Sequence, residues 1–293
     1  METGRRTYTY KTVGGCKIRA DVYAPGDPGP RPVIVWIHGG ALIMGGRDEL
    51  RAWQRDAYLA AGYQVVSIDY RLAPESRLPA IIEDLEDACR WVRQRGPRLF
   101  EADPQRMAVI GHSAGGYLTL MAAVRVTPRP QAVVSFYGYG DIVGAWYSRP
   151  DPFYLQQPLV SEGEARASVG TRVISETQEH AKRGRFYLYC RQQGIWPREV
   201  TGRDPAAEPE WFGQYCPVQQ VTGEHPPALL LHGDRDTDVP YEQSVMMATA
   251  LGHAGVEHEV ITIPDGQHGF DAEPTPVARD ALRRVLDFLR LHL

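Results

Sequence analysis

A serine flanked by glycines is the strongest chemical signal in the sequence. The run Gly111-His112-Ser113-Ala114-Gly115-Gly116 follows the apolar stretch Met107–Ile110 and opens an apolar helical pattern. When Gly-x-Ser-x-Gly lies between a strand and a helix, the glycines permit a sharp turn that exposes the serine hydroxyl. The positive end of the helix dipole then favours an oxyanion at that point. A glycine-rich cap with Ser113 as an ordinary capping residue is the alternative; the flanking strand and helix favour a nucleophile.

A second glycine run follows another apolar stretch, in His38-Gly39-Gly40-Ala41. Attack on a carbonyl requires backbone donors aimed at the developing oxyanion, and glycines let the chain approach a substrate closely. We expect the N–H groups of Gly40, Ala41 and Ala114 to form this oxyanion hole. His38 is expected to brace the loop rather than to touch a substrate. A simple Gly-Gly turn would be the interpretation if the serine turn were absent.

A serine hydroxyl needs an adjacent base, and His268 is the best candidate. In enzymes with such a serine turn, the acid and then the histidine follow the serine along the chain. His268 lies in the loop Pro264–Phe270, after an apolar strand pattern and before the last helical pattern. His112 adjoins the serine, so we expect its side chain to point elsewhere and to be structural.

Three aspartates compete for the role of the acid that orients the base. Asp234, Asp236 and Asp238 all follow the apolar run Leu229–Leu231. The role requires a buried carboxylate that fixes the histidine tautomer and balances the imidazolium charge. Asp234 and Asp238 could instead cap turns, and spacing alone leaves the three candidates open.

The elements that must position these residues alternate between strands and helices. The alternation predicts an α/β fold, a mostly parallel sheet with helices on both sides, whose active site lies at the carboxyl ends of the strands. The first two strands are expected to pair antiparallel through a hairpin at Gly14-Gly15. The predicted strands are Tyr8–Val13, Lys17–Tyr23, Val33–Ile37, Gln64–Ile68, Met107–Ile110, Ala132–Phe136, Ala228–Leu231 and Glu257–Ile263. The predicted helices are Leu50–Ala61, Leu78–Gln94, Ser113–Val124, Tyr241–Ala254 and Val277–Leu291.

The segment 138–215 differs in texture from the rest of the chain. It is irregular and holds 12 of the 28 aromatic residues. We therefore assign residues 1–137 and 216–293 to the core and 138–215 to an inserted cap or lid, whose rings favour a covered apolar pocket. Packing of these rings on the body is the alternative. The basic residues of the segment are expected to form a solvated helix face, and contact with an acidic substrate is the alternative: Arg172, Lys182, Arg183, Arg185 and Arg191.

Composition excludes several other classes of function. The net charge is −4, and charges of both signs are interspersed, which gives no electrostatic case for binding nucleic acid or anionic membranes. The four cysteines, Cys16, Cys89, Cys190 and Cys216, lack metal-ligand spacing. We expect no metal and no organic cofactor. No run is apolar enough to span a bilayer and no secretory signal is visible, so a cytoplasmic enzyme is expected.

Taken together, these motifs resemble the α/β-hydrolases of the hormone-sensitive-lipase and bacterial carboxylesterase group, including feruloyl-esterase-like proteins. The matching pieces follow the family's order from about Val33 to Phe270: His38–Ala41, Asp69–Glu75, Gly111–Gly116, His232–Pro240 and Gly266–Phe270. The resemblance implies that Asp236 is the acid beside Ser113 and His268, and it implies the same three oxyanion donors. Ala41 departs from the commoner third glycine of the family, but its backbone N–H remains.

The resemblance implies a carboxylic ester hydrolase acting on small molecules. Because we expect the lid to be modest, we expect esters with short-to-medium acyl or aryl groups. An amidase or peptidase, or an acyltransferase, could use the same three residues. A non-catalytic protein that binds a small ligand in the lidded pocket is the alternative from another class. The last amphipathic helix could pair with a second copy, so a homodimer is possible.

Overall fold

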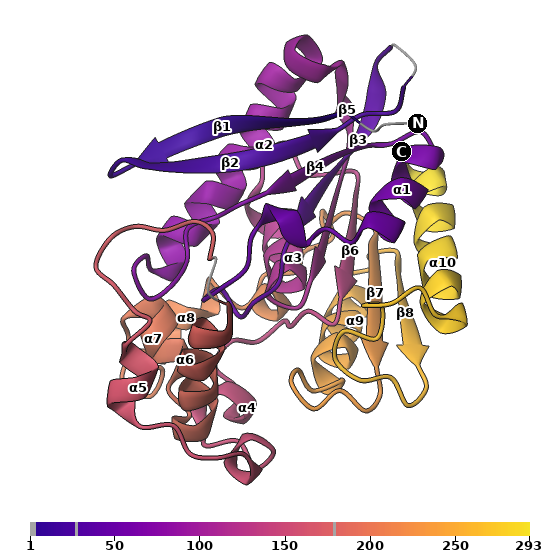
Figure 1. Ribbon diagram of the computed structural model, residues 1–293. Coiled ribbons are helices and arrows are strands. Elements are labelled where there is room, and N and C mark those ends of the chain that lie inside the picture. The colour runs from indigo at the N-terminus through magenta and orange to yellow at the C-terminus, as the bar shows by residue number, and fades with distance from the viewer. Residues whose placement is uncertain (1–3, 27–28, 178–179) are drawn as a thin grey trace.

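An eight-stranded sheet forms the centre of the computed structural model (Figure 1), which describes residues 4–26, 29–177 and 180–293. Residues 1–3, 27–28 and 178–179, which fall within the predicted core and cap ranges, lie outside the described residues. The strand order is β1-β2-β4-β3-β5-β6-β7-β8. All neighbours from β4 to β8 are parallel, whereas β1–β2 and β2–β4 are antiparallel. The predicted α/β architecture is confirmed.

The strands agree closely with the predicted runs. The hairpin between β1 and β2 turns at Gly14-Gly15, with Val13 paired to Cys16 as expected. Two strands, β4 and β6, have the predicted bounds, and β5 is longer because it begins at Ala102. The strands are β1 Arg5–Val13, β2 Cys16–Tyr23, β3 Arg31–Ile37, β4 Gln64–Ile68, β5 Ala102–His112, β6 Ala132–Phe136, β7 Ala228–Gly233 and β8 His258–Ile263.

Alternate side chains of the central strands feed two separate cores. In β3, Val33, Val35 and Ile37 join the core on the side of α2 (Leu78–Phe100) and α3 (Ala114–Arg125). Ile34 and Trp36 join the core on the side of α1 (Ala52–Ala60) and α10 (Pro276–His292). Because both faces are covered, the strand is apolar at consecutive positions rather than at every second one.

The helices of the core follow the predicted patterns, with one clear difference. The predicted helix Leu78–Gln94 continues to Phe100, through Gly96 and Pro97. It ends at Glu101, whose left-handed backbone lets its N–H donate to the Gly96 carbonyl. The remaining core helices are α1 Ala52–Ala60, α9 Glu242–His253 and α10 Pro276–His292.

The segment 138–215 forms short helices that gather at one end of the molecule, at the lower left of Figure 1. Its described residues contain no strand. The helices are α4 Ala145–Ser148, α5 Glu162–Arg166, α6 His180–Gln193, α7 Trp196–Thr201 and α8 Pro209–Gly213.

The prediction that the basic residues of this segment form a solvated face is wrong at two positions. Arg183 is buried and forms an ion pair with Glu75, 2.6 Å away. Arg191 is also buried, and it pairs with Asp151 and Asp238. Each guanidinium is neutralised by carboxylates from elsewhere in the chain, a tertiary pairing that local helix periodicity does not reveal. Arg172 is exposed, as expected.

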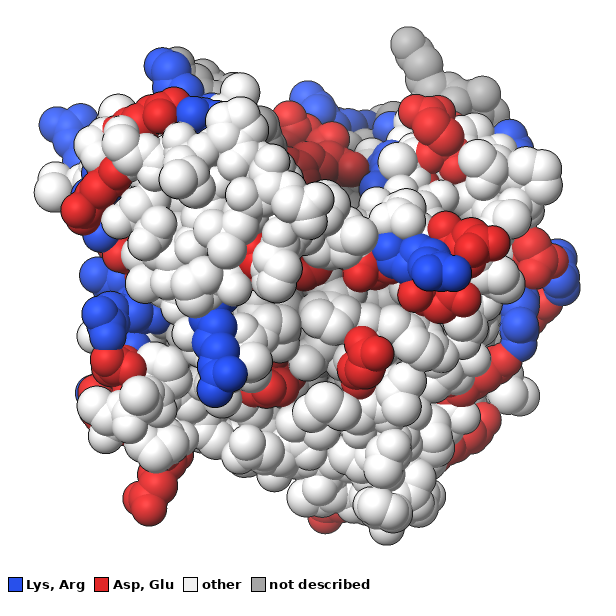
Figure 2. Space-filling model, turned by 90° about the horizontal axis from the view of Figure 1, so that it is seen from below, with Lys and Arg blue, Asp and Glu red and all other residues white. Residues whose placement is uncertain are grey.

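The carboxyl ends of β7 and β8 point toward the lower end of the molecule in Figure 1, and Figure 2 views that end. Uncharged residues cover most of this face, and side chains of both signs are interspersed among them.

The apolar side of α10 packs into the core that it shares with α1, and Leu282, Val285 and Leu289 are buried there. No helix within the described ranges is both long and apolar enough to cross a membrane.

We predict that a buried carboxylate anchors α2 to the rest of the core. Asp84 is fully buried and accepts hydrogen bonds from the Arg71 backbone N–H (2.9 Å) and guanidinium Nε (2.7 Å), and Lys11 Nζ lies 2.8 Å away. Asp84→Ala would leave two cations without their buried partner. The free energy of unfolding should fall by about 3–5 kcal/mol, as measured by urea denaturation. The more exposed Asp87→Ala is the control, with an expected loss of about 1 kcal/mol or less; equal losses would contradict the prediction.

Candidate active site

The turn at Ser113 is held in an unusual backbone conformation between β5 and α3. Ser113 has φ 55°, and its N–H donates to the Phe136 carbonyl at 2.9 Å. A Cβ atom on Gly111 would lie 2.1 Å from the Gly115 carbonyl oxygen, and one on Gly115 would lie 2.2 Å from the Ile37 oxygen. Only glycine fits at either place, so these two residues allow the helix to approach the strands closely enough to form the turn.

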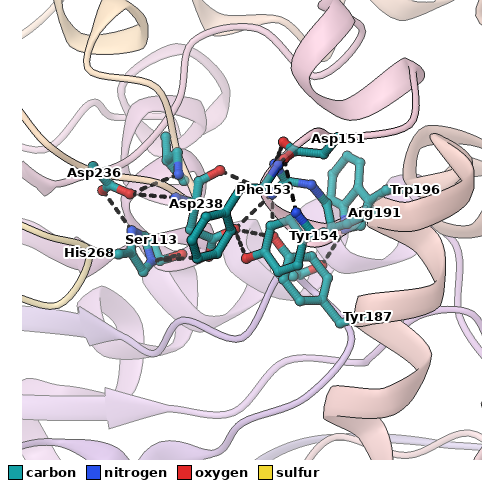
Figure 3. A network of polar contacts seen from close by, with 12 residues as sticks. Ser113, Asp151, Phe153, Tyr154, Tyr187, Arg191, Trp196, Asp236, Asp238 and His268 are labelled. Atoms are coloured by element: carbon teal, nitrogen blue, oxygen red, sulfur yellow. Dashed lines mark hydrogen bonds and ion pairs between the residues drawn. The ribbon is translucent and has the colours of Figure 1, made fainter. Parts of the chain in front are cut away.

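The structure brings Ser113, His268 and Asp236 together in one chain of polar contacts (Figure 3). The distance from Ser113 Oγ to His268 Nε2 is 3.0 Å, and that from His268 Nδ1 to Asp236 Oδ2 is 2.7 Å. A carboxylate only accepts hydrogen bonds, so Nδ1 carries the proton and Nε2 is free to accept one from the serine hydroxyl. Of the three aspartates that spacing left open, Asp236 contacts Nδ1, whereas Asp234 is exposed.

Hydrogen bonds keep the Asp236 carboxylate ionised although its side chain is buried. Burial raises its pKa, but hydrogen bonds from His232 and His268 and from the Asp238 backbone outweigh burial and hold the pKa well below its usual value. The backbone N–H groups of Asp238 and Val239 donate to Oδ1 at 2.8 and 3.0 Å. A permanent negative charge therefore lies beside His268.

The pKa of His268 is raised above its ordinary value of 6.5. Burial lowers it, but the charge of Asp238 and the hydrogen bond and charge of Asp236 outweigh burial. The Tyr137 ring packs against the imidazole, with the ring centroids 4.7 Å apart. The neutral form of His268 is therefore a stronger base than the side chain of an ordinary histidine.

A second polar network, which the sequence did not indicate, lies behind the serine. The buried Asp271 accepts hydrogen bonds from Tyr137 Oη (2.6 Å) and Gln54 Nε2 (2.6 Å), lies 2.8 Å from His112 Nε2, and pairs with Arg51. These partners outweigh burial and hold the pKa of Asp271 well below its usual value. His112 thus directs its ring to Asp271, in keeping with its expected structural role. Only the position of Asp271, three residues after His268, could have drawn attention to it.

The predicted oxyanion loop borders the same cavity as the serine. Gly40 and Ala41 line the cavity, both with positive φ, and Trp196 Nε1 donates to the Ala41 carbonyl at 2.9 Å. The buried His38 stacks on Tyr70 at a centroid distance of 4.2 Å, as expected of a brace. Ala114 is the first residue of α3 and is fully buried.

The cavity beside Ser113 is small, at about 260 Å³. Of the described residues of segment 138–215, only Tyr187 lines it. The other rings expected there stack largely on one another, as Tyr147 does on Trp196 with centroids 4.0 Å apart. The described residues hold no group of three or more His, Cys, Asp or Glu side chains that could bind a metal ion. The cavity is lined by Trp36, Gly39, Gly40, Ala41, Met44, Glu49, Arg51, His112, Ser113, Tyr137, Tyr187, Asp238, His268 and Gly269.

Comparison with known proteins shows the family to which the chain belongs. The model of the alpha/beta hydrolase fold family matches residues 34–272, so the chain belongs to that family. Similar solved structures include a protein of unknown function from Staphylococcus aureus (24% identical, TM-score 0.80, covering 98% of this chain and 99% of that one). An esterase from Thermogutta terrifontis is 22% identical with a TM-score of 0.69, covering 98% and 93% of the two chains, and was solved with propionate bound.

Curated relatives are much longer than this chain. A non-reducing polyketide synthase from Stachybotrys bisbyi is 29% identical over 306 residues, which cover 92% of this chain and 14% of the relative. A non-reducing polyketide synthase from Aspergillus terreus is 28% identical over 98% of this chain and again 14% of its own length. The chain therefore spans about a seventh of these relatives.

The raised pKa of His268 predicts the pH dependence of any reaction at Ser113. A His268 side chain that takes the serine proton must first be neutral, so we expect the rate of such a reaction to fall as the pH drops through the pKa of His268, with a midpoint above 6.5. Release of p-nitrophenol from paraoxon, followed from about pH 5 to pH 9, measures this rate, and peptide mapping identifies the modified serine. A midpoint below 6.5 would contradict the prediction, because burial rather than the two carboxylates would then dominate the pKa of His268.

Proposed function

We propose that the protein is a carboxylic ester hydrolase with Ser113 as nucleophile, His268 as base and Asp236 as the acid that orients the base. The observation that carries the proposal is the continuous contact from Ser113 Oγ through His268 to the Asp236 carboxylate, at 3.0 and 2.7 Å, beside a cavity. A serine at a strained turn with a histidine on one side is the arrangement that activates a hydroxyl for attack on a carbonyl.

In the proposed mechanism, Ser113 Oγ attacks the ester carbonyl carbon while its proton passes to His268 Nε2. The carbonyl oxygen becomes an oxyanion that accepts hydrogen bonds from the N–H groups of Gly40, Ala41 and Ala114. The His268 imidazolium then protonates the oxygen of the alcohol as the ester carbon–oxygen bond breaks. The alcohol departs, and the acyl group remains bound to Ser113. His268 next deprotonates a water molecule, which attacks the acyl carbon. The acyl–oxygen bond then breaks, the imidazolium returns the proton to Ser113 Oγ, and the carboxylic acid leaves.

The size of the cavity supports substrates with short acyl groups. At about 260 Å³ it is smaller than the roughly 300–1,000 Å³ of pockets that enclose drug-sized ligands. The similar esterase from Thermogutta terrifontis was solved with propionate and with butyrate bound, and also phosphorylated by paraoxon. We propose that segment 138–215 acts as a cap that bounds this cavity through Tyr187.

Transfer of the acyl group to an alcohol other than water is a second candidate. The curated relatives are named as polyketide synthases, and the same acyl-enzyme would serve a transferase if a second alcohol reached the site before water. An amidase, a peptidase or a non-catalytic binding protein are further outcomes that an activity assay would separate.

Hydrolysis of p-nitrophenyl esters from acetate to long acyl chains tests the proposal. Wild type should hydrolyse the short esters fastest. Ser113→Ala and His268→Ala should each lower kcat by about 10⁴-fold or more, because the nucleophile and the base act as a unit. Ser161→Ala, at an exposed serine outside the cavity, is the matched control and should retain full activity. Activity that survives in Ser113→Ala would contradict the assignment of the nucleophile; a folded wild type inactive on every ester would favour an amide substrate or binding alone.

A further inference from the structure

A second carboxylate approaches His268 from the side of the serine. Asp238 Oδ2 lies 3.5 Å from His268 Nε2, the same nitrogen that lies 3.0 Å from Ser113 Oγ. Asp236, two residues earlier in the same loop, contacts the other nitrogen. One short loop after β7 thus presents a carboxylate to each nitrogen of the imidazole.

Residues of segment 138–215 hold the other oxygen of Asp238 in place (Figure 3). Asp238 Oδ1 accepts hydrogen bonds from Tyr154 Oη (2.8 Å), Tyr187 Oη (2.5 Å) and Arg191 Nη1 (2.7 Å). Arg191 also donates to the Asp238 carbonyl at 3.0 Å. These contacts fix the carboxylate so that its second oxygen remains turned toward His268.

Arg191 is itself held in place, so its contacts with Asp238 are also fixed. Its side chain is 1% exposed, and its second terminal nitrogen pairs with Asp151 at 2.5 Å. Its guanidinium lies over the rings of Tyr154 and Tyr147, 4.6 and 5.0 Å from their centroids, where the negative faces of the rings favour a cation. The cation therefore compensates Asp238 from the side opposite His268.

We propose that Asp238 is a positioning residue that acts through His268: its charge stabilises the imidazolium formed when Ser113 gives up its proton, and Arg191 and the two tyrosines set its place. The inference rests on the proposed function. A separation of 3.5 Å exceeds the 2.7–2.9 Å of a charge-assisted hydrogen bond. Asp238 thus acts by its charge and leaves the proton on Nε2 available to the leaving alcohol.

Other charged and titratable groups also face the imidazole, and they do not compete with this role. Asp236 lies on the opposite nitrogen, and Asp271 is compensated by Arg51. The charge of Asp238 raises the pKa of His268, as do the hydrogen bond and the charge of Asp236. The charged and titratable groups that contact the ring, act on it by charge or line the same cavity are Glu49, Arg51, His112, Ser113, Tyr137, Tyr187, Asp236, Asp238 and Asp271.

The test is the pH profile of kcat/KM on a short p-nitrophenyl ester. Asp238→Asn keeps an acceptor oxygen for the tyrosines and Arg191 but removes the negative charge. Without that charge the imidazolium is less stable, so the acidic limb should move to lower pH by about 1 unit. Asp234→Asn removes the same charge from an exposed position in the same loop and should leave the limb in place.

Tyr154→Phe provides a second variant if Asp238→Asn fails to fold. The substitution removes one hydrogen-bond donor from Asp238 and keeps the packing of the ring. Because the negative charge of Asp238 is then less compensated, it stabilises the imidazolium more strongly. The acidic limb should move to higher pH by a few tenths of a unit. A purely structural role would change Tm or KM in either variant without moving the limb. An unmoved limb in a folded Asp238→Asn variant overturns the inference.

Titration of the His268 ring by NMR separates failure of this inference from failure of the proposed function, because it needs no substrate. The His268 signal is identified by its loss in His268→Gln. Its midpoint should fall by about 1 unit in Asp238→Asn and stay fixed in Asp234→Asn. If the protein hydrolyses no ester but the midpoint moves as expected, the proposed activity fails and the electrostatic coupling stands; a midpoint that does not move rejects the coupling.

Discussion

The close approach of α3 to β3 and β5 is the constraint on which the rest of the site depends. Glycine at 111 and 115 lets backbone atoms meet where a Cβ would lie 2.1–2.2 Å from a carbonyl oxygen. This contact forces Ser113 to φ 55°, a conformation that costs a non-glycine residue about 1–3 kcal/mol and that the surrounding sheet must stabilise. Because the turn is fixed, the loops after β3, β7 and β8 need only converge on one point.

Charge compensation is the second organising feature. Three aspartates, Asp236, Asp238 and Asp271, surround His268 and Ser113, and each has its own cationic or donor partners. For Asp236 and Asp271, burial raises the pKa, and the hydrogen bonds and charges of their partners outweigh it, so both carboxylates stay ionised. The ion pair between Arg191 and Asp238 also joins segment 138–215 to the loop that carries Asp236.

The sequence predicted the parts of this arrangement that local pattern encodes. The consecutive apolar residues of β4 and β6 marked both strands to the residue, and the motif around Ser113 indicated the turn. Spacing did not separate Asp234, Asp236 and Asp238, because their roles depend on which carboxylate the loop turns inward. Arg191, predicted to be solvated, and Asp271, which no sequence pattern marks, both have ionic or hydrogen-bond partners more than 35 positions away along the chain. Such pairings are tertiary and leave no periodic signal.

The most direct test of the account is to look for the acyl group on the enzyme itself. Wild type is mixed with p-nitrophenyl butyrate, quenched in acid during turnover, digested and analysed by mass spectrometry. A butyryl group is expected on the peptide that contains Ser113, and none is expected after prior reaction of the enzyme with paraoxon. A butyryl group on a different residue, or unchanged ester hydrolysis by protein already blocked at Ser113, would contradict this prediction.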